Sequence, residues 1–361
     1  MKRILILTNH SFMLWQFRRE LIMALQDRGC RVIIGVPFGD HIDDFERIGC
    51  KMIDTPLERR GLNPIRDMKL YRQYVRIITE ENPDLVITYS IKPNVYGGYA
   101  CRKLSVPYCV NVQGLGSAFQ KPMVARLVTA MYKVAVKEAK VVFFENEGNA
   151  RYFRKKNITP EAQQVVLRGA GINLEFWAQK PYPRNQHIRF LYLGRLMREK
   201  GITELFEACR RLHDEGEEFL LDLVGFFEDE YKQQMEDLVS WGIAKFHGFQ
   251  SDARPFYEQA DCVVLPSYHE GMSNVLLEAA ATGRPVIASF IPGCRETFSF
   301  LERSGLTCRA QDANSLYRAM KYFLSLDWEE RNEMGLAGRE RMREQFAKEE
   351  VVEQTLEAIF R

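Results

Sequence analysis

Several signatures that would assign a function directly are missing from this 361-residue sequence. It has no Cys-x-x-Cys pair and no two histidines four residues apart, so we predict none of the common zinc sites. No Gly-x-x-x-x-Gly-Lys-Ser/Thr segment occurs, which excludes a P-loop. Residues 114–119 and 169–174 both begin Gly-x-Gly, but neither segment has the third glycine of a dinucleotide fingerprint.

Long apolar runs and a targeting segment are also missing. No stretch approaches the roughly 20 apolar residues of a membrane-spanning helix. The apolar run at the start of the chain ends at Asn9 and His10, so we expect no signal peptide. The eight cysteines are scattered, mostly within apolar runs, which predicts reduced, buried thiols in a cytoplasmic protein.

What is present is the composition of a soluble globular protein, with 46% hydrophobic and 27% charged residues. The length favours two domains of ordinary size. The net charge of +2 hides an asymmetry. Residues 56–76 carry six basic and two acidic groups, and residues 121–140 carry five basic and one acidic. The positive charge is therefore concentrated in the first half of the chain.

Short β-rich segments alternate with helical patterns in both halves of the sequence. In the first half we predict strands at 3–8, 31–36, 84–88, 108–112 and 140–144, and helices at 15–28, 66–82, 94–103 and 122–139. In the second half we predict strands at 188–193, 219–224, 262–266 and 285–289, and helices at 201–214, 228–239, 274–282 and within 312–361. This alternation indicates βαβ units and parallel sheets covered on both faces.

The stretch between the two halves, residues 169–186, has two glycines, two prolines and no sustained period, which is typical of a linker. We therefore predict an α/β protein with two doubly wound, Rossmann-like domains facing each other across a cleft. The first domain is placed at residues 1–172, the linker at 173–186 and the second domain at 187–345. Ligands of such sheets bind at the carboxyl ends of the strands.

One polar motif, HEGMSNVLLEA at 269–279, follows a predicted strand of the second half. Glu270 and Gly271 lie in the loop, and Ser273 and Asn274 are good helix-start residues whose free N–H groups favour an anion. A helical rise over residues 270–278 spans about 12 Å, which is comparable to the reach from a ribose across a diphosphate to a hexose. Each carboxylate can accept hydrogen bonds from two sugar hydroxyls. The alternative is a loop glutamate plus a solvated helix glutamate, and the spacing alone does not decide.

A second motif, LYLGRLMREKG at 191–201, also leaves a strand into a loop. It places Arg195 and Lys200 before the next helix, where two cations form a clamp for a diphosphate. Cations in a loop are usually solvated. The combination of this motif with the glutamate motif favours the functional interpretation.

These segments resemble the donor-binding half of retaining GT-B glycosyltransferases of the family 4 type. The Glu-x7-Glu motif of that family maps onto Glu270 and Glu278. The segments GAGINLEFW (169–177) and FHGFQSDARPFYEQADCVVLPS (246–267) are also similar to the family. The resemblance covers essentially the whole chain, more strongly after residue 160. It implies a GT-B fold in which a C-terminal helix, residues 346–361, packs back on the first domain.

The resemblance implies a UDP-sugar donor, retention of the anomeric configuration, and no cofactor or divalent metal. Arg195 and Lys200 would hold the diphosphate, Glu278 the ribose and Glu270 the transferred sugar, with Glu270, Lys200 and Arg195 as the catalytic residues. Backbone amides would meet phosphate and sugar oxygens, and Phe246 and Gly248 would lie where the family's backbone meets the uracil. The other predicted donor-binding residues are Gly194, Gly271, Met272, Ser273 and Asn274.

The departures from the family pattern lie in the first half. The loop at 8–17 has no glycine where many members have two, and Asn111 and Gln113 stand near the position of a histidine in other members. The predicted acceptor-side residues are His10, Gln113, Gly114, Asn146 and Glu147. No single catalytic base is assigned, because the departing phosphate can take the proton of the acceptor in a front-face mechanism.

Within the family, NVQGLGSAF and FFENEGNARYF resemble bacterial enzymes that extend lipid-linked sugars in surface-polysaccharide and glycoprotein assembly. The predicted acceptor is a polyprenyl-diphosphate-linked sugar, and N-acetylhexosamine is the transferred sugar by resemblance alone. We predict a peripheral protein at the inner face of the cell membrane, held by cations on two amphipathic helices. Those cations are Arg66, Lys69, Arg72, Arg126, Lys133 and Lys137. No recognition motif supports nucleic-acid binding.

Two other functions are compatible with a nucleotide-sugar site. A nucleotide-sugar epimerase of similar architecture needs an acid/base pair at the sugar, and the sequence offers none in the motifs above. A catalytically silent nucleotide-sugar-binding protein is disfavoured because Arg195, Lys200, Glu270 and Glu278 are all present.

Overall fold

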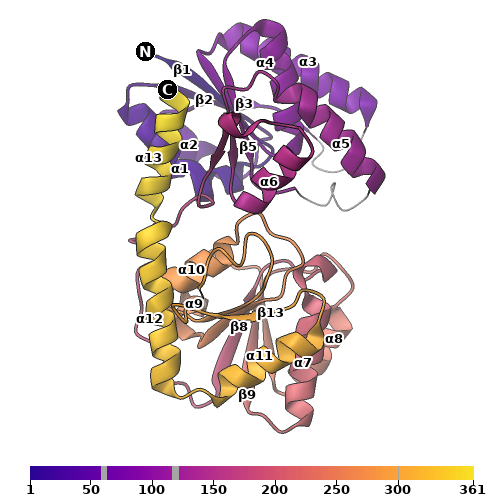
Figure 1. Ribbon diagram of the computed structural model, residues 1–361, viewed down its shortest axis with the longest axis vertical. Coiled ribbons are helices and arrows are strands. Elements are labelled where there is room, and N and C mark those ends of the chain that lie inside the picture. Colours follow the sequence, from indigo (N-terminus) through magenta and orange to yellow (C-terminus); the bar gives the residue numbers. More distant parts are fainter. Residues whose placement is uncertain (58–62, 116–121, 300) are drawn as a thin grey trace. The chain divides into compact units, whose positions relative to one another are not determined.

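A computed structural model describes the whole chain except residues 58–62, 116–121 and 300. The described residues form two compact units (Figure 1). Unit 1 comprises Met1–Gly171 and Lys348–Arg361, and unit 2 comprises Ile172–Ala347. The chain therefore leaves unit 1 once and returns to it with its last helix.

Unit 1 contains a seven-stranded parallel sheet in the order β3-β2-β1-β4-β5-β6-β7. The strands are β1 (Arg3–Leu7), β2 (Arg31–Val36), β3 (Lys51–Asp54), β4 (Leu85–Tyr89), β5 (Tyr108–Val112), β6 (Val141–Phe144) and β7 (Gln164–Val166). The strand order reverses between β1 and β4, so the carboxyl ends of these two strands flank the switch point at which doubly wound sheets bind ligands.

Helices cover both faces of this sheet, which explains why its strands are apolar throughout. Leu5 and Leu7 of β1 face the core under α3, α4 and α5, whereas Ile4 and Ile6 face the core under α1 and α13. The helices are α1 (Ser11–Asp27), α2 (Ile42–Arg47), α3 (Pro64–Glu81), a π-helical turn (Pro93–Gly97), α4 (Gly98–Leu104), α5 (Pro122–Ala135), α6 (Glu147–Lys155) and α13 (Lys348–Phe360).

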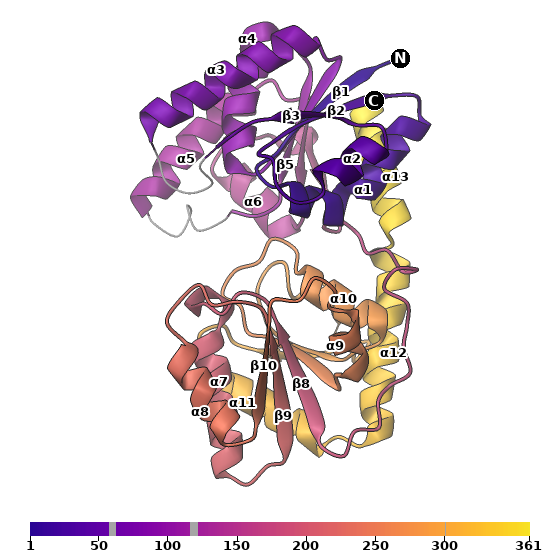
Figure 2. The ribbon, with the colours of Figure 1, turned by 180° about the vertical axis from the view of Figure 1, so that it is seen from behind.

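Unit 2 repeats the design with a six-stranded parallel sheet in the order β10-β9-β8-β11-β12-β13 (Figure 2). Its strands are β8 (Ile188–Leu193), β9 (Phe219–Val224), β10 (Ala244–Gly248), β11 (Cys262–Leu265), β12 (Val286–Ser289) and β13 (Leu306–Cys308). Its helices are α7 (Ile202–Asp214), α8 (Lys232–Ser240), α9 (Arg254–Gln259), α10 (Asn274–Thr282), α11 (Ala313–Ser325) and α12 (Trp328–Gln345). The switch point lies between β8 and β11. The prediction of two Rossmann-like α/β sheets is confirmed.

One predicted helix was too long, because α5 ends at Ala135 and not at residue 139. Side chains from elsewhere in unit 1 bind the carbonyls at and just after the end of α5. The Tyr108 hydroxyl donates to the Ala135 carbonyl (2.6 Å), and the Gln163 amide donates to the carbonyls of Val136 (2.9 Å) and Ala139 (2.5 Å). Lys137 therefore lies in the turn after α5 and not on its face.

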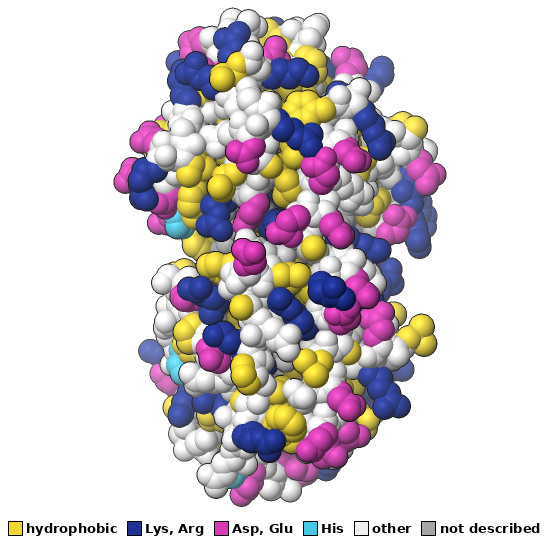
Figure 3. All heavy atoms as spheres, turned by 90° about the vertical axis from the view of Figure 1, so that its left-hand side faces the viewer, with side chains coloured by type: hydrophobic (Ala, Val, Ile, Leu, Met, Phe, Trp, Pro, Cys, Tyr) yellow, Lys and Arg dark blue, Asp and Glu magenta, His cyan; other side chains and the backbone are white. Residues whose placement is uncertain are grey.

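All eight cysteines are buried and unpaired, which confirms the prediction of buried free thiols. Within the described residues, no helix combines the length and apolar character needed to cross a membrane. Cationic and anionic side chains are interspersed on the face shown in Figure 3, in keeping with the small net charge.

Candidate active site

Two loops of unit 2, after β8 and β11, meet at the switch point. The loop after β8 passes through a 3-10 turn (Arg198–Lys200) to Gly201, whose positive φ of 74° begins α7. A Cβ on Gly201 would lie 2.1 Å from the carbonyl oxygen of Pro266, so only glycine lets these loops lie this close. The Tyr268 N–H also donates to the Glu199 carbonyl (2.9 Å). These contacts position the two predicted motifs beside each other.

Lys200 and Glu270 form an ion pair across these loops, with 2.6 Å between Lys200 Nζ and Glu270 Oε1. The two side chains are only 21% and 13% exposed. Such a pair is poorly screened by solvent and holds both charges in one place. The structure therefore brings together a cation predicted for the diphosphate and a carboxylate predicted for the transferred sugar, although they lie 70 positions apart in the sequence.

Arg195 is held by a partner that the sequence analysis did not identify. Its guanidinium forms an ion pair with Glu228, which lies in the loop after β9, and remains 41% exposed. The loops after β8 and β9 lie so close that a Cβ on Gly225 would be 1.8 Å from the Gly194 carbonyl oxygen. Glycine at position 225 permits this approach. The Tyr192 hydroxyl donates to the Arg195 carbonyl (2.7 Å) and fixes the backbone there. Arg195 thus keeps an accessible charge on a rigid support.

Glu278 is buried and not solvated, so the alternative of a solvated helix glutamate is wrong for this residue. It lies in α10 at 5% exposure, and the hydroxyl of Tyr257 in α9 donates to its carboxylate (2.8 Å). Burial, and secondly the charge of Glu278, raises the pKa of Tyr257 well above its ordinary value, which keeps Tyr257 a donor. A carboxylate is costly to bury without such partners. Tyr257 is a second residue that the sequence analysis missed.

One predicted ligand contact is occupied by the protein itself. The Ser273 N–H, predicted to face the donor, donates to the Gly293 carbonyl (2.9 Å). This bond forms because Gly293, at a φ of 86°, lies against the Gly271 carbonyl, where a Cβ would approach to 2.3 Å. The Ser273 hydroxyl caps α10 by accepting from the Leu276 N–H (3.4 Å). The backbone amides of Met272 and Asn274 remain predicted contacts to the phosphate and sugar oxygens of the donor.

The region predicted to meet the uracil is a bulge in β10. The pairing of β10 with β9 shifts between Phe246 and Gly248, and the Gly248 carbonyl accepts from the Gly225 N–H (2.9 Å). The Phe246 ring packs against Phe227, with 5.0 Å between ring centroids. Two other rings remain open, because Phe226 is 48% and Phe249 63% exposed. Their centroids are 6.5 Å apart, and their faces can stack against a planar base.

A small polar cavity of about 180 Å³ lies at the switch point of unit 1. Two of the predicted acceptor-side residues, His10 and Gln113, line it. The Ser90 hydroxyl, at a positive φ of 75°, donates to the side chain of Asn9 (2.7 Å) beside them. The other lining residues are Thr8, Met13, Leu14, Arg18 and Tyr89. Its hydroxyl, amide and imidazole groups are suited to binding a polyhydroxylated acceptor.

The remaining predicted acceptor-side residues do not line this cavity. Asn146 is the buried N-cap of α6 and accepts from the Asn149 N–H (2.8 Å). Glu147 forms an ion pair with Arg154 on the surface of the same helix. Gly114 directly follows Gln113 in the chain, and the residues from 116 onward lie outside the described part.

A buried charge cluster borders the cavity and was not predicted. Arg18 Nη2 lies 2.5 Å from Glu145 Oε1, and the guanidinium lies over the Tyr89 ring at 5.4 Å. Burial raises the pKa of Glu145, although the charges of Arg18 and Lys348 oppose that shift. Burial likewise lowers the pKa of Lys348 to about 8. The only sequence signal was a cation, Arg18, within the apolar stripe of α1.

The predicted membrane-facing cations are all exposed, but they do not all lie on the two predicted helices. Arg66, Lys69 and Arg72 lie on α3, and Arg126 and Lys133 lie on α5. Lys137 follows the end of α5, as described above. Lys140, the last residue of the second basic segment, donates to the Ile359 carbonyl of α13 (2.9 Å). Arg59, Arg60 and Lys121 of the two basic segments lie outside the described residues.

Comparisons with known proteins place the chain in a family. Residues 14–169 match the family described as "Glycosyl transferase 4-like domain", and residues 175–341 match "Glycosyl transferases group 1". The chain is 27% identical over 342 residues, 89% of each chain, to the N,N'-diacetylbacillosaminyl-diphospho-undecaprenol alpha-1,3-N-acetylgalactosaminyltransferase of Campylobacter jejuni. It is 25% identical over 276 residues, 71% of this chain and 70% of the relative, to the UDP-Gal:alpha-D-GlcNAc-diphosphoundecaprenol alpha-1,3-galactosyltransferase of Escherichia coli.

Solved structures show the same fold. Anabaena Alr3699/HepE, crystallised in complex with UDP-glucose, superposes with a TM-score of 0.81 at 17% identity and 99% coverage of both chains. Sucrose-phosphate synthase from Thermosynechococcus elongatus superposes with a TM-score of 0.81 at 21% identity, covering 99% of this chain and 98% of that chain.

Proposed function

The chain belongs to the glycosyltransferases, with a 4-like domain in its first half and a group 1 domain in its second, and from that premise we propose a retaining hexosyltransferase. The donor is a UDP-sugar bound by unit 2, and the acceptor is a polyprenyl-diphosphate-linked sugar bound by unit 1. The reaction serves the assembly of a bacterial surface polysaccharide or glycan. No metal or cofactor takes part. The observation that carries the proposal is the shielded ion pair between Lys200 and Glu270 at the switch point of unit 2.

The proposed chemistry is stabilisation of a departing diphosphate. When the bond between the anomeric carbon and the phosphate oxygen breaks, negative charge develops on the β-phosphate. Lys200 and Arg195, held ready by Glu270 and Glu228, supply positive charge at fixed positions, and such preorganised charge lowers the barrier. The departing phosphate oxygen takes the proton of the acceptor hydroxyl, which attacks from the same face, so the anomeric configuration is retained.

The two acids of the motif have separate proposed tasks. Glu270 accepts hydrogen bonds from the transferred sugar once Lys200 turns to the diphosphate, so donor binding exchanges one partner for another. Glu278, already fixed by Tyr257, accepts from the ribose diol. The transferred sugar is proposed as an N-acetylhexosamine, and the name of the Campylobacter jejuni relative supports that choice.

A donor screen tests the proposal. The protein is incubated with a panel of UDP-sugars and a polyprenyl-diphosphate-linked acceptor, with UDP release and the sugar products both measured. The expected result is transfer, fastest with UDP-N-acetylhexosamines. Isomerised UDP-sugar without transfer would instead identify an epimerase, and binding without any product would identify a silent nucleotide-sugar-binding protein.

Phe249 is proposed to stack against the uracil. The Phe249→Ala variant is expected to lose roughly 1–3 kcal/mol of UDP binding, or about 5- to 150-fold in Kd, because a ring face is removed. Calorimetric titration with UDP measures this loss. The control is Trp241→Ala, which removes an exposed ring stacked on His213 just before β10, at the end of that strand opposite to Phe249. Equal affinities of wild type and Phe249→Ala would rule out the stacking.

We also propose that exposed cations of α3 hold the protein against the inner face of the cell membrane. Each basic residue near an anionic surface contributes about 1 kcal/mol, so the triple variant Arg66→Ala/Lys69→Ala/Arg72→Ala is expected to bind anionic vesicles about 100-fold more weakly. Flotation at low salt measures the binding. The triple variant Arg151→Ala/Lys155→Ala/Lys156→Ala, which removes three exposed cations around α6 of the same unit, is the control. Failure of the wild type to float would end this proposal.

A further inference from the structure

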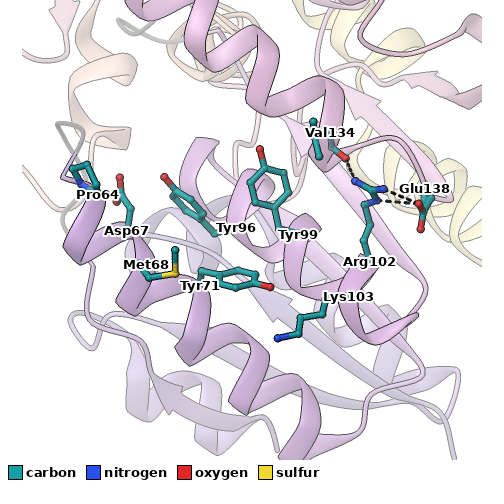
Figure 4. Close-up of a pocket in the computed structure, with 10 residues that line it drawn as sticks. All are labelled: Pro64, Asp67, Met68, Tyr71, Tyr96, Tyr99, Arg102, Lys103, Val134 and Glu138. Atoms are coloured by element: carbon teal, nitrogen blue, oxygen red, sulfur yellow. Dashed lines mark hydrogen bonds and ion pairs between the residues drawn. The ribbon is translucent and has the colours of Figure 1, made fainter.

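A groove between α3, α4 and α5 of unit 1 is much larger than the polar cavity at the switch point. Its volume is about 640 Å³, within the range of roughly 300–1,000 Å³ typical of ligand pockets. Figure 4 shows side chains from the three helices converging on it. Most of the lining is aromatic or apolar, namely Pro64, Met68, Tyr71, Tyr96, Tyr99 and Val134.

The polar groups around this groove are largely bonded within the protein. The Tyr99 hydroxyl donates to the Met131 carbonyl (3.0 Å). Burial, and secondly the charge of Asp67, raises the pKa of Tyr96. The Asp67 carboxylate accepts a hydrogen bond from Lys92 Nζ (2.8 Å). At the other end, Arg102 donates to Glu138 and to the Val134 carbonyl, as the dashed lines in Figure 4 show. Since Tyr99 donates its hydroxyl to the protein, it presents mainly its ring face to a ligand.

Exposed apolar side chains also lie on α3 and α5, two of the three helices around the groove. Ile65 of α3 is 72% exposed, and Met123 and Leu127 of α5 are 84% and 49% exposed. A cluster of large exposed apolar residues marks a binding surface more often than a single one does. Lys103 lines the groove, and Lys69 of α3 is also exposed. Cations beside an apolar groove complement a ligand that is both apolar and anionic.

The groove and the polar cavity lie on either side of one helical segment. Ser90 lines the cavity and Tyr96 lines the groove. The intervening residues 91–95 are helical and run into the π-helical turn Pro93–Gly97, so less than two turns of helix separate Ser90 from Tyr96. A ligand whose sugar occupies the cavity can therefore extend an attached chain into the groove without leaving unit 1.

We propose that this groove binds an isoprenoid segment of the polyprenyl chain of the acceptor. The inference rests on the proposed function and specifies which part of the lipid the protein itself holds. The methyl-branched, unsaturated chain offers no hydrogen-bonding group, which suits ring faces and a thioether. The cations beside the groove attract the diphosphate to which the chain is attached.

Photolabelling tests the site without requiring sugar transfer. The probe is geranylgeranyl diphosphate with a diazirine at the end of its chain, and labelled peptides are mapped by mass spectrometry. Label is expected in peptides of residues 64–76 and 93–104, and unlabelled undecaprenyl diphosphate is expected to displace it. Label confined to other peptides overturns the proposal. Equal displacement by phospholipid vesicles free of isoprenoids also overturns it, in favour of an acyl-chain site.

A matched pair of variants on α3 sharpens the test. Met68→Glu places a charge in the groove at a position that is 48% exposed, and labelling is expected to fall at least tenfold. Thr79→Glu adds the same charge at an exposed position of α3 that does not line the groove, and labelling is expected to stay at the wild-type level. Equal labelling of the two variants overturns the proposal.

Transfer assays separate this inference from the proposed function. Met68→Glu is expected to raise KM about tenfold for a long-chain acceptor at unchanged kcat, and to leave KM for a two-isoprene acceptor unchanged. Wild-type protein that labels in the groove but transfers no sugar contradicts the proposed function alone. Wild-type protein that transfers sugar but does not label in the groove contradicts the isoprenoid site alone.

Discussion

The Lys200→Ala variant is expected to lower kcat by about 10²–10³-fold, because it removes one preorganised charge from the departing diphosphate. Glu270→Ala is expected to lower kcat comparably, since it removes the carboxylate that accepts hydrogen bonds from the transferred sugar and that holds Lys200 ready before the donor binds. Initial rates of UDP release with saturating donor and acceptor measure both effects. In the double variant, the fold loss in kcat should be smaller than the product of the two single losses, because the residues act as one unit.

The control for this pair is Lys232→Ala. Lys232 pairs with Glu236 at 3.7 Å on the surface of α8, and its side chain is 76% exposed. Removing that pair is expected to leave kcat unchanged and to alter stability by less than about 1 kcal/mol. Wild-type rates in either Lys200→Ala or Glu270→Ala would remove these residues from the proposed mechanism, whatever the control shows.

The Arg18→Met variant is expected to destabilise unit 1 by about 3–5 kcal/mol, because it leaves the buried carboxylate of Glu145 without its partner. Both side chains are well shielded, at 7% and 12% exposure. Hydrogen exchange of amides in β1 and β4 reports the free energy of unfolding for unit 1. The double variant Arg18→Met/Glu145→Gln is expected to recover much of the loss, since no buried charge is then unpaired.

The control for the buried pair is Arg76→Met. Arg76 and Glu80 are 3.9 Å apart on α3 and more than 60% exposed, so their pair contributes little. A destabilisation by Arg18→Met no larger than that of Arg76→Met would show that the Arg18–Glu145 contact does not stabilise unit 1.

The protonation of Glu145 also affects the stability of unit 1, because burial raises the pKa of this carboxyl. A raised pKa in the folded state stabilises unit 1 at low pH, and this contribution is lost as the pH rises through the folded pKa.

The central strands of both sheets could be predicted from the sequence because burial on both faces makes them continuous apolar runs. Edge strands escaped prediction for the opposite reason. In β3 (Lys51–Asp54) and β10 (Ala244–Gly248), polar residues interrupt the run, and pairing on one side alone holds the strand in place. The end of α5 could not be found either, because it depends on carbonyl contacts with Tyr108 and Gln163, distant in sequence.

The residues that the candidate site shares with the sequence prediction lie within short motifs at strand ends. Local order along the chain is enough to place Lys200 and Glu270 there. Their partners are a different matter, because Glu228 and Tyr257 reach Arg195 and Glu278 only through the packing of neighbouring loops and helices. Nothing in their own surroundings in the sequence distinguishes them from other glutamates and tyrosines of the chain. Arg18 and Glu145, 127 positions apart, illustrate the same limit.

The route of the chain has a consequence for synthesis. Gly171 lies against Lys348, where a Cβ would be 2.9 Å from the Lys348 Cα, so unit 1 is completed by a helix made at least 176 residues after the rest of it. At roughly 5–20 residues per second, the ribosome needs about 10–40 s to supply that helix. Unit 2 is continuous in sequence and can fold within that interval, whereas the nascent unit 1 exposes the apolar surface of α1 until Val351, Leu356 and Ile359 emerge. Chaperones that bind exposed apolar segments are expected to act on the amino-terminal half of this polypeptide first.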